Sequence, residues 1–296
     1  MSEPILLCAG ADDRASVSPL GAQLLSWRAQ AIELLWSPDA AVWSETAPLL
    51  FPVVGWTRNG TTRVADREFT LGLHGFARRK RFSLVERSQA AARFVLEADE
   101  ETLTLYPFAF RLEARFALRP GELEITLLAT NRDEQPLPYA AGLHPGFRWP
   151  LAGSRADHTI RFERAERPEV PVIAPGGLFS ERRRSIPLDG AVLPLTRELM
   201  AREALCFLDA ASRRLAYDNG AGLRLHVELD DFPHIALWSA PPAPFLCIEA
   251  WTGHGDPEDF RGDLYEKPSM RILDPGASAS HRATFRLETG APGAAE

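Results

Sequence analysis

The sequence predicts an all-β protein whose antiparallel strands form a sandwich or a barrel. Apolar and polar residues alternate with a period of two in many short runs, which is the pattern of strands with one buried face and one wet face. Turn residues separate these runs, and the chain holds 21 glycines and 24 prolines. Convincing helical patterns are scarce. These three features together favour an antiparallel β fold.

The clearest strand pair lies between residues 110 and 129. Alternate residues of 110–118 are apolar with charged residues between them, Pro120-Gly121 turns the chain, and the alternation resumes over 123–129. A second hairpin is predicted around Asp218-Asn219-Gly220, because this typical hairpin turn is flanked by alternating residues. Both hairpins are expected to present one face to a core.

Further strands complete the predicted fold. They are expected at residues 4–9, 23–27, 33–36, 82–87, 92–98, 158–162, 235–238, 270–273 and 281–287. Single helical turns are expected at residues 40–45, 197–201 and 257–263. Residues 164–194 are rich in proline, glycine and arginine, and they predict a long irregular excursion.

Size and charge limit the domain organisation and the partners. With 296 residues and 45% hydrophobic content, the chain can bury a large core, and we expect one domain over residues 1–289 with a disordered tail at 290–296. A net charge of -7 argues against a nucleic acid or an anionic membrane as partner, since both favour a basic surface. A small molecule is the expected partner.

Cysteine usage and the N-terminus suggest an intracellular setting. Cys8, Cys206 and Cys247 are too few and too scattered for a disulfide framework. The start MSEPILLCAG has no basic region and is not expected to be a signal peptide. No run approaches the roughly 20 apolar residues of a membrane span. We therefore expect a cytoplasmic protein.

His144 is the first candidate for chemistry. It lies in PYAAGLHPGFRWP, residues 138–150, directly before Pro145. Proline disfavours helix for the residue before it, so His144 is expected at a strand end or in a stiff loop, with Phe147 and Trp149 close by. A titratable ring between aromatic walls suits a sugar site. The alternative is a histidine that only caps a strand end.

Glu249 is the second candidate, in the apolar run FLCIEAWTG, residues 245–253. Burial of a carboxylate without a partner is costly, and it raises the pKa of the group and makes it a better base. The alternative is a structural glutamate paired with an arginine. Trp251, two residues later, is a candidate for substrate binding.

Two further stretches carry candidate binding residues. APLLFPVVGWTRNG, residues 47–60, ends in a turn that would expose Trp56 and Arg58, although Trp56 is equally compatible with a place in the core. LHGFARRKR follows with His74 and a run of cations that begins at Arg78. Such a run is either a solvated face or a site for hydroxyls or a phosphate, because arginine offers a bidentate fork.

The remaining candidates give weaker signals. His254 and Asp256 are residue types that can ligate a metal, but no third ligand follows at a suitable spacing. No metal is therefore expected. Asp230 and Asp231, which precede Phe232-Pro233, are typical of a turn.

Five stretches in this order, LLWSPDAAVW, APLLFPVVG, LHGFAR, GLHPGFRWPL and FLCIEAWTG, resemble the aldose 1-epimerase (galactose mutarotase-like) family. The likeness spans about residues 20–285 and is strongest to the bacterial branch that includes LacX-type and hexose-6-phosphate epimerase-like proteins. The resemblance implies an antiparallel β-supersandwich that binds a sugar on a concave face.

The resemblance also implies roles for the candidate residues. His144 would be the general acid toward the ring oxygen, and Glu249 would be the base on the anomeric hydroxyl. His74 and Arg78 would bind substrate. Neither a metal nor a nucleotide cofactor is implied, and the partner would be a monosaccharide or a sugar phosphate bound by a monomer or homodimer.

The chain departs from the family pattern at three places. Trp56 stands where related chains often carry an arginine, with Arg58 two residues later, and Ala250 stands where proline is commoner. An aspartate that binds sugar hydroxyls in better-known mutarotases has no clear counterpart, and Asp209 is only a guess. A contact to the sugar is therefore expected to be lost or shifted.

Several functions remain open from the sequence. The first expectation is interconversion of the α- and β-anomers of an aldose. One alternative is a hexose-6-phosphate 1-epimerase whose phosphate lies on Arg78 or on residues 182–184. Others are a sugar-binding protein without turnover, and a glycoside hydrolase with Glu249 and a second carboxylate about 5 to 10 Å away, for which only Asp230 and Asp231 are offered.

Overall fold

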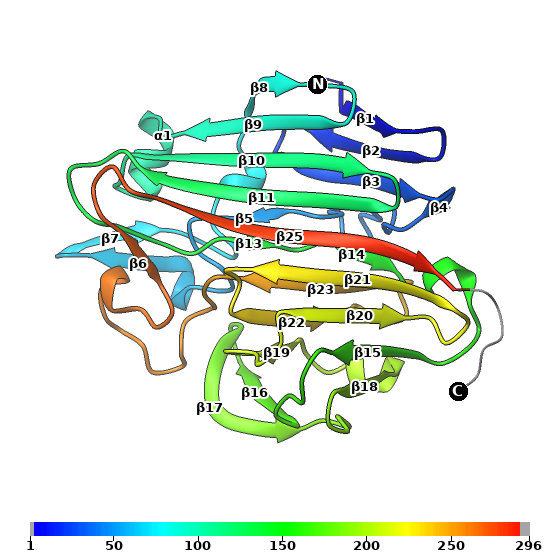
Figure 1. Ribbon diagram of the computed structural model, residues 1–296. Helices are drawn as coiled ribbons and strands as arrows, with labels where there is room; N and C mark the ends of the chain where they lie inside the picture. Colours follow the sequence, from blue (N-terminus) through cyan, green and yellow to red (C-terminus); the bar gives the residue numbers. More distant parts are fainter. Residues whose placement is uncertain (1–2, 291–296) are drawn as a thin grey trace.

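A large antiparallel sheet crosses the molecule (Figure 1). The computed structural model describes residues 3–290. Nine strands form this sheet in the spatial order β18-β15-β20-β21-β25-β11-β10-β9-β8. Their bounds are Ser83–Arg87 (β8), Ala91–Glu97 (β9), Phe110–Arg119 (β10), Glu122–Asn131 (β11), His158–Phe162 (β15), Val192–Leu195 (β18), Arg214–Asp218 (β20), Leu223–Asp230 (β21) and Ser278–Thr289 (β25).

A second sheet lies behind the first in the view of Figure 1. It has six strands in the order β19-β22-β23-β13-β5, and β14 also pairs with β23. The strands are Leu49–Leu50 (β5), Gly142–Leu143 (β13), Gly146–Arg148 (β14), Leu205–Phe207 (β19), His234–Trp238 (β22) and Phe245–Trp251 (β23). Every residue of β23 is buried, which explains why its sequence is almost continuously apolar.

Smaller units complete the chain. The four-stranded sheet and the three two-stranded sheets contain Ile5–Ala9 (β1), Asp13–Ser18 (β2), Gln23–Ala29 (β3), Ile32–Glu33 (β4), Thr61–Val64 (β6), Arg67–Thr70 (β7), Leu137–Tyr139 (β12), Glu169–Ala174 (β16), Leu178–Ser185 (β17) and Arg271–Leu273 (β24). The helical turns are Glu100–Leu105 (α1), Arg197–Met200 (α2), Arg58–Gly60 (η1), Ala77–Arg79 (η2), Leu151–Gly153 (η3) and Leu264–Glu266 (η4).

The main core lies between the two large sheets. Leu246, Ile248 and Ala250 of β23 belong to the same buried cluster as the inward residues of β10, β11 and β25, and the rings of Phe147 and Phe285 are 5.6 Å apart across it. Successive side chains of a strand point to opposite faces. Residue 249 therefore points away from this core, and this parity places the carboxylate on the other face of the six-stranded sheet.

The all-β prediction and both predicted hairpins are confirmed. Residues 110–131 form the pair β10 and β11 in continuous register, and residues 214–230 form β20 and β21. A helical turn near residue 197 is also confirmed as α2. Of the predicted tail at 290–296, residues 291–296 lie outside the part of the chain that the structure describes.

Three local predictions are wrong. Residues 40–45 form a tight turn instead of a helix, because the Asp39 carboxylate accepts from the Ala41 N–H and the Asp39 carbonyl accepts from the Trp43 N–H. Residues 257–263 form a turn, in which the Phe260 N–H donates to the Pro257 carbonyl, and the short helix η4 begins only at Leu264. The excursion at residues 164–194 is not irregular, since it contains the hairpin of β16 and β17.

One α-helix was not predicted. α1 begins at a capping box in which the Asp99 carboxylate accepts from the Thr102 N–H and the Thr102 hydroxyl accepts from the Asp99 N–H. Its six residues are too few to show a helical period. Between residues 3 and 290, no helix has the length and apolar character that a membrane crossing requires.

Candidate active site

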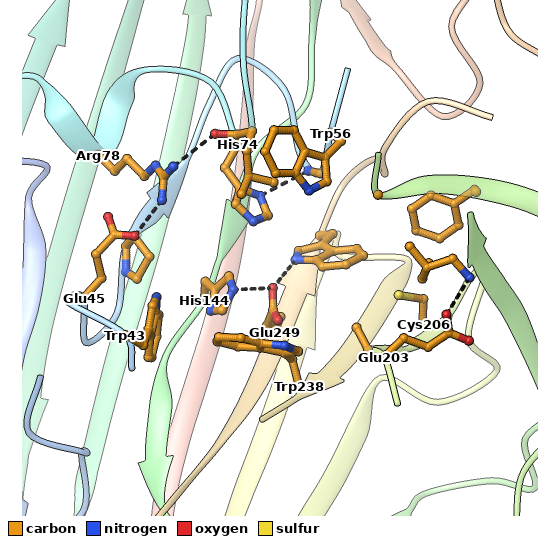
Figure 2. Close-up of a pocket in the computed structure, with 18 residues that line it drawn as sticks. Trp43, Glu45, Trp56, His74, Arg78, His144, Glu203, Cys206, Trp238 and Glu249 are labelled. Atoms are coloured by element: carbon orange, nitrogen blue, oxygen red, sulfur yellow. Dashed lines mark hydrogen bonds and ion pairs between the residues drawn. The ribbon is translucent and has the colours of Figure 1, made fainter. Parts of the chain in front are cut away.

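A cavity of about 400 Å³ lies on the face of β23 that is turned away from the main core (Figure 2). Strands β22 and β23 supply its floor through Trp238, Glu249 and Trp251. The hairpin of β16 and β17 supplies one wall through Ile173 and Phe179. Segments far apart in sequence therefore meet around one buried carboxylate.

Glu249 is 2% exposed, and its contacts are polar. Its Oε2 accepts a hydrogen bond of 3.0 Å from the indole Nε1 of Trp251 and lies 3.2 Å from Nε2 of His144. Among the described residues no arginine pairs with it. The alternative of a structural glutamate paired with an arginine is therefore wrong.

His144 reaches Glu249 because two strands beside β23 flank it. β13 ends at Leu143 and β14 begins at Gly146, and both pair with β23, so the connection that carries His144 crosses directly beside Glu249. The imidazole lies between the rings of Trp43, at 5.2 Å, and Trp238, at 5.8 Å. It is a buried member of the cavity wall rather than a strand cap.

Burial shifts the pKa of both members of this pair. Desolvation lowers the pKa of His144 from 6.5 to about 3, and the charge of Arg78 contributes in the same direction. Desolvation also raises the pKa of Glu249 well above 4.5, against the opposing effect of the Trp251 hydrogen bond. Both shifts favour the uncharged form of each group. The uncharged pair therefore holds one proton between Nε2 and Oε2.

His74 is a second histidine of the cavity, 9% exposed. Its Nδ1 accepts a hydrogen bond of 3.1 Å from the Gly55 N–H, so the proton of the neutral ring lies on Nε2. Burial, His144 and Arg78 all lower its pKa. His74 is therefore a neutral hydrogen-bond donor, and its ring meets that of His144 edge to face at 5.5 Å.

Arg78 lines the same cavity but is already paired. Its Nη1 lies 2.5 Å from Oε2 of Glu45, and its Nη2 donates to the Leu73 carbonyl at 3.3 Å. The two side chains are only 11% and 22% exposed. Glu45 was not identified from the sequence, because its turn has no pattern that announces a carboxylate at a site.

Trp56 lies at the opening of the cavity, 43% exposed. Its ring packs over Gly177, where an added Cβ would come within 1.8 Å of Cδ1 of the indole. Arg58 does not line the cavity, since its guanidinium donates to the carbonyls of Phe260 and Pro257. The Phe260 bond is 3.0 Å long, and it holds Arg58 on the neighbouring loop.

The cavity brings together six of the seven predicted site residues, namely His74, Arg78, Trp56, Trp251, His144 and Glu249. Sequence reasoning missed the aromatic walls Trp43 and Trp238 and the carboxylates Glu45 and Glu203. Trp43 lies in a stretch that carried the family resemblance, which was an available signal. Trp238, Glu45 and Glu203 have no sequence signal that marks them as site residues.

The weaker candidates lie elsewhere. The Asp256 carboxylate contacts the buried ammonium of Lys267 at 2.6 Å and accepts a hydrogen bond from the backbone N–H of Arg58 at 2.8 Å. This carboxylate is therefore already engaged in an ion pair. Asp209 has an 87% exposed side chain and does not line the cavity. Asp230 and Asp231 pair with arginines outside the cavity. In residues 3–290, no three potential ligands are grouped as a metal would need.

Comparison with known proteins agrees with this architecture. A profile of the family described as aldose 1-epimerase matches residues 4–285. The chromosomal protein LacX of Lactococcus lactis subsp. lactis is 32% identical over 271 residues, which are 86% of this chain and 90% of LacX.

Two solved structures extend the comparison. A galactose mutarotase-like protein from Lactobacillus casei superposes with a TM-score of 0.89 at 26% identity, covering 97% of this chain and all of that one. Galactose 1-epimerase from Lactobacillus acidophilus shares the fold, with a TM-score of 0.74 at 15% identity and coverage of 97% and 95%. The antiparallel β-supersandwich is thus of the galactose mutarotase-like type, and the chain belongs to the aldose 1-epimerase family.

Proposed function

We propose that this protein is a carbohydrate epimerase that interconverts the α- and β-anomers of an aldose, with Glu249 as the base on the anomeric hydroxyl and His144 as the acid toward the ring oxygen. The observation that carries the proposal is the contact of 3.2 Å between His144 Nε2 and Glu249 Oε2 inside the cavity. Membership of the aldose 1-epimerase family supports it. No metal or nucleotide is needed for this reaction.

The reaction requires two proton transfers. To open the ring, Glu249 as carboxylate takes the proton of the C1 hydroxyl, and protonated His144 delivers one to the ring oxygen as the bond from C1 to that oxygen breaks. The aldehyde then rotates about the C1–C2 bond. Ring closure on the other face returns both protons by the reverse route, and each positioned group contributes about 10² to 10⁴ in rate.

The electrostatics of the pair suit this cycle. Ring opening leaves Glu249 protonated and His144 neutral, which is the uncharged combination that burial favours. The proton held by the resting pair must first pass from Glu249 to His144, which gives the charged pair, and ring opening then returns the pair to its favoured uncharged form.

The walls of the cavity fit a sugar. Trp43, Trp238 and Trp251 present aromatic surface on which the C–H face of a pyranose packs, while the neutral His74 offers an N–H to a hydroxyl. The exposed Trp56 covers the opening. Apolar walls with a few convergent polar groups are typical of small-molecule sites.

Polarimetry of freshly dissolved α-glucose and α-galactose tests the proposal. The wild-type protein should accelerate the change in rotation, and Glu249→Gln should abolish that acceleration. Acceleration that survives in the variant would reject the assignment of Glu249. No acceleration on any aldose, combined with saturable sugar binding, would make this a sugar-binding protein without turnover.

A further inference from the structure

The charges in the cavity are unevenly distributed. Of the described residues that line it, Arg78 is the only lysine or arginine, whereas three carboxyl groups line it, those of Glu45, Glu203 and Glu249. A binding site for a phosphate dianion normally presents uncompensated cations or several N–H donors. This balance of charge therefore bears on which sugars can bind.

Arg78 and Glu45 form an ion pair whose two members are held in place by further contacts. The Glu45 carbonyl accepts a hydrogen bond of 2.8 Å from the indole of Trp36, which fixes the backbone that carries the carboxylate. Arg78 is held by η2 and by its bond to the Leu73 carbonyl. Figure 2 shows the guanidinium and the Glu45 carboxylate turned toward each other beside His144. An ion pair held from both sides keeps its geometry when a ligand enters.

The opposite end of the cavity is also acidic. Figure 2 places Glu203 on the far side of Glu249 from Glu45. The Glu203 carboxylate contacts Arg184 at 2.8 Å and accepts from the Ile173 N–H at 3.0 Å, but Arg184 itself does not line the cavity. A phosphate at either end would therefore lie against a carboxylate.

We propose that Glu45 determines the class of substrate: by compensating Arg78, it reserves the cavity for uncharged aldoses and excludes sugar phosphates. This inference rests on the proposed epimerase function for its substrate. A sugar hydroxyl can both accept from Arg78 and donate to Glu45, so it uses the pair as it stands. A phosphate on Arg78 would be repelled by Glu45 at contact distance, and like charges juxtaposed in a site disfavour the ligand strongly.

Exchange NMR of the anomeric protons tests the inference, because it measures catalysed anomer exchange at equilibrium for glucose and glucose 6-phosphate alike. The wild-type protein should exchange glucose at least about tenfold faster than glucose 6-phosphate at equal subsaturating concentrations. Glu45→Gln should shift this ratio toward the phosphate by on the order of tenfold or more, since it leaves Arg78 uncompensated. A wild-type preference for glucose 6-phosphate would overturn the inference and leave the epimerase standing.

Two controls isolate the pair. Glu163→Gln breaks a carboxylate and arginine pair of 2.7 Å that lies outside the cavity, and it should leave the ratio unchanged. The double variant Glu45→Gln/Arg78→Gln should lose the gain, because no cation remains to bind the phosphate. An equal shift in the Glu163 variant, or a gain that persists without Arg78, would contradict the role of Glu45.

Calorimetric titration with glucose 6-phosphate provides a readout that does not depend on turnover. Glu45→Gln should bind it at least about tenfold more tightly than wild type, and the gain should shrink as salt is added. Equal affinity of the two proteins would overturn the inference. If the wild-type protein exchanges no sugar at all, the epimerase proposal fails, and this titration still decides whether Glu45 excludes anions.

Discussion

Nε2 of His144 and Oε2 of Glu249 lie 3.2 Å apart although their side chains are only 8% and 2% exposed. The contact exists because β13 and β14 flank the strand that carries Glu249. Trp43 closes over the imidazole, and Gly146 permits this approach, since a Cβ there would come within 2.6 Å of the Trp43 ring. An imidazole and a carboxyl group are thus held together in a buried site, away from bulk water.

We expect removal of either member of the pair to eliminate catalysis. Glu249→Gln and His144→Asn should each lower kcat by about 10² or more, because each loses one proton transfer. Polarimetry measures this, and circular dichroism checks the fold. His158→Asn serves as a control, because His158 is buried but lies outside the cavity. Near-normal turnover in either site variant would contradict the mechanism.

The pH dependence of kcat/KM should be broad. Activity requires one proton on the pair. On the acid side it is lost only when a second proton charges His144, whose pKa burial lowers to about 3. On the alkaline side it is lost when the last proton leaves, which the raised pKa of Glu249 delays to higher pH.

Measurement of kcat/KM with subtraction of the uncatalysed rate at each pH checks this. No decline is expected between pH 7 and about pH 5, where an ordinary histidine with a pKa of about 6.5 would become charged. A fall in kcat/KM centred near pH 6.5 would show that the His144 imidazole titrates as if it were in water. That result would contradict a pair of His144 and Glu249 that is shielded from solvent.

Gly177→Ala should impair substrate binding through Trp56. An added Cβ would meet the Trp56 indole at 1.8 Å, so the ring must leave its place at the opening of the cavity. We expect KM to rise by on the order of tenfold, since small displacements of positioning groups are costly. Tryptophan fluorescence should change as well.

Gly176→Ala is a matched control for that substitution. Gly176 has a φ of +82° and Gly177 one of +76°, so both substitutions strain the backbone similarly, but a Cβ at Gly176 meets nothing within 4 Å. Equal effects of the two variants on KM would assign the change to backbone strain instead of to Trp56.

Lys267→Met should destabilise the fold. Lys267 is 3% exposed and pairs with Asp256, so its removal leaves a buried carboxylate without its cation, which typically costs about 3–5 kcal/mol. Urea unfolding at pH 7 measures the loss. The double variant Lys267→Met/Asp256→Asn should recover part of it, and a single variant as stable as wild type would show that the pair contributes little.

Much of the architecture was predictable from local pattern. Alternation in residues 110–131 specifies a strand pair because period two is a property of the strand itself. Helices of only one or two turns, such as α1, could not be predicted. Their ends depend on capping contacts, and they are too short to show a helical period. The hairpin of β16 and β17 was obscured by exposed arginines on β17.

By itself, the sequence determined the strand periodicity and the family motifs around His144 and Glu249. Only the tertiary structure decided that Arg78 is compensated by Glu45, that Arg58 is held away from the cavity, and that Trp43 and Trp238 enclose the imidazole. The reason is physical. Strand patterning reflects neighbours along the chain, whereas charge pairing, burial and pKa depend on groups brought together from distant segments.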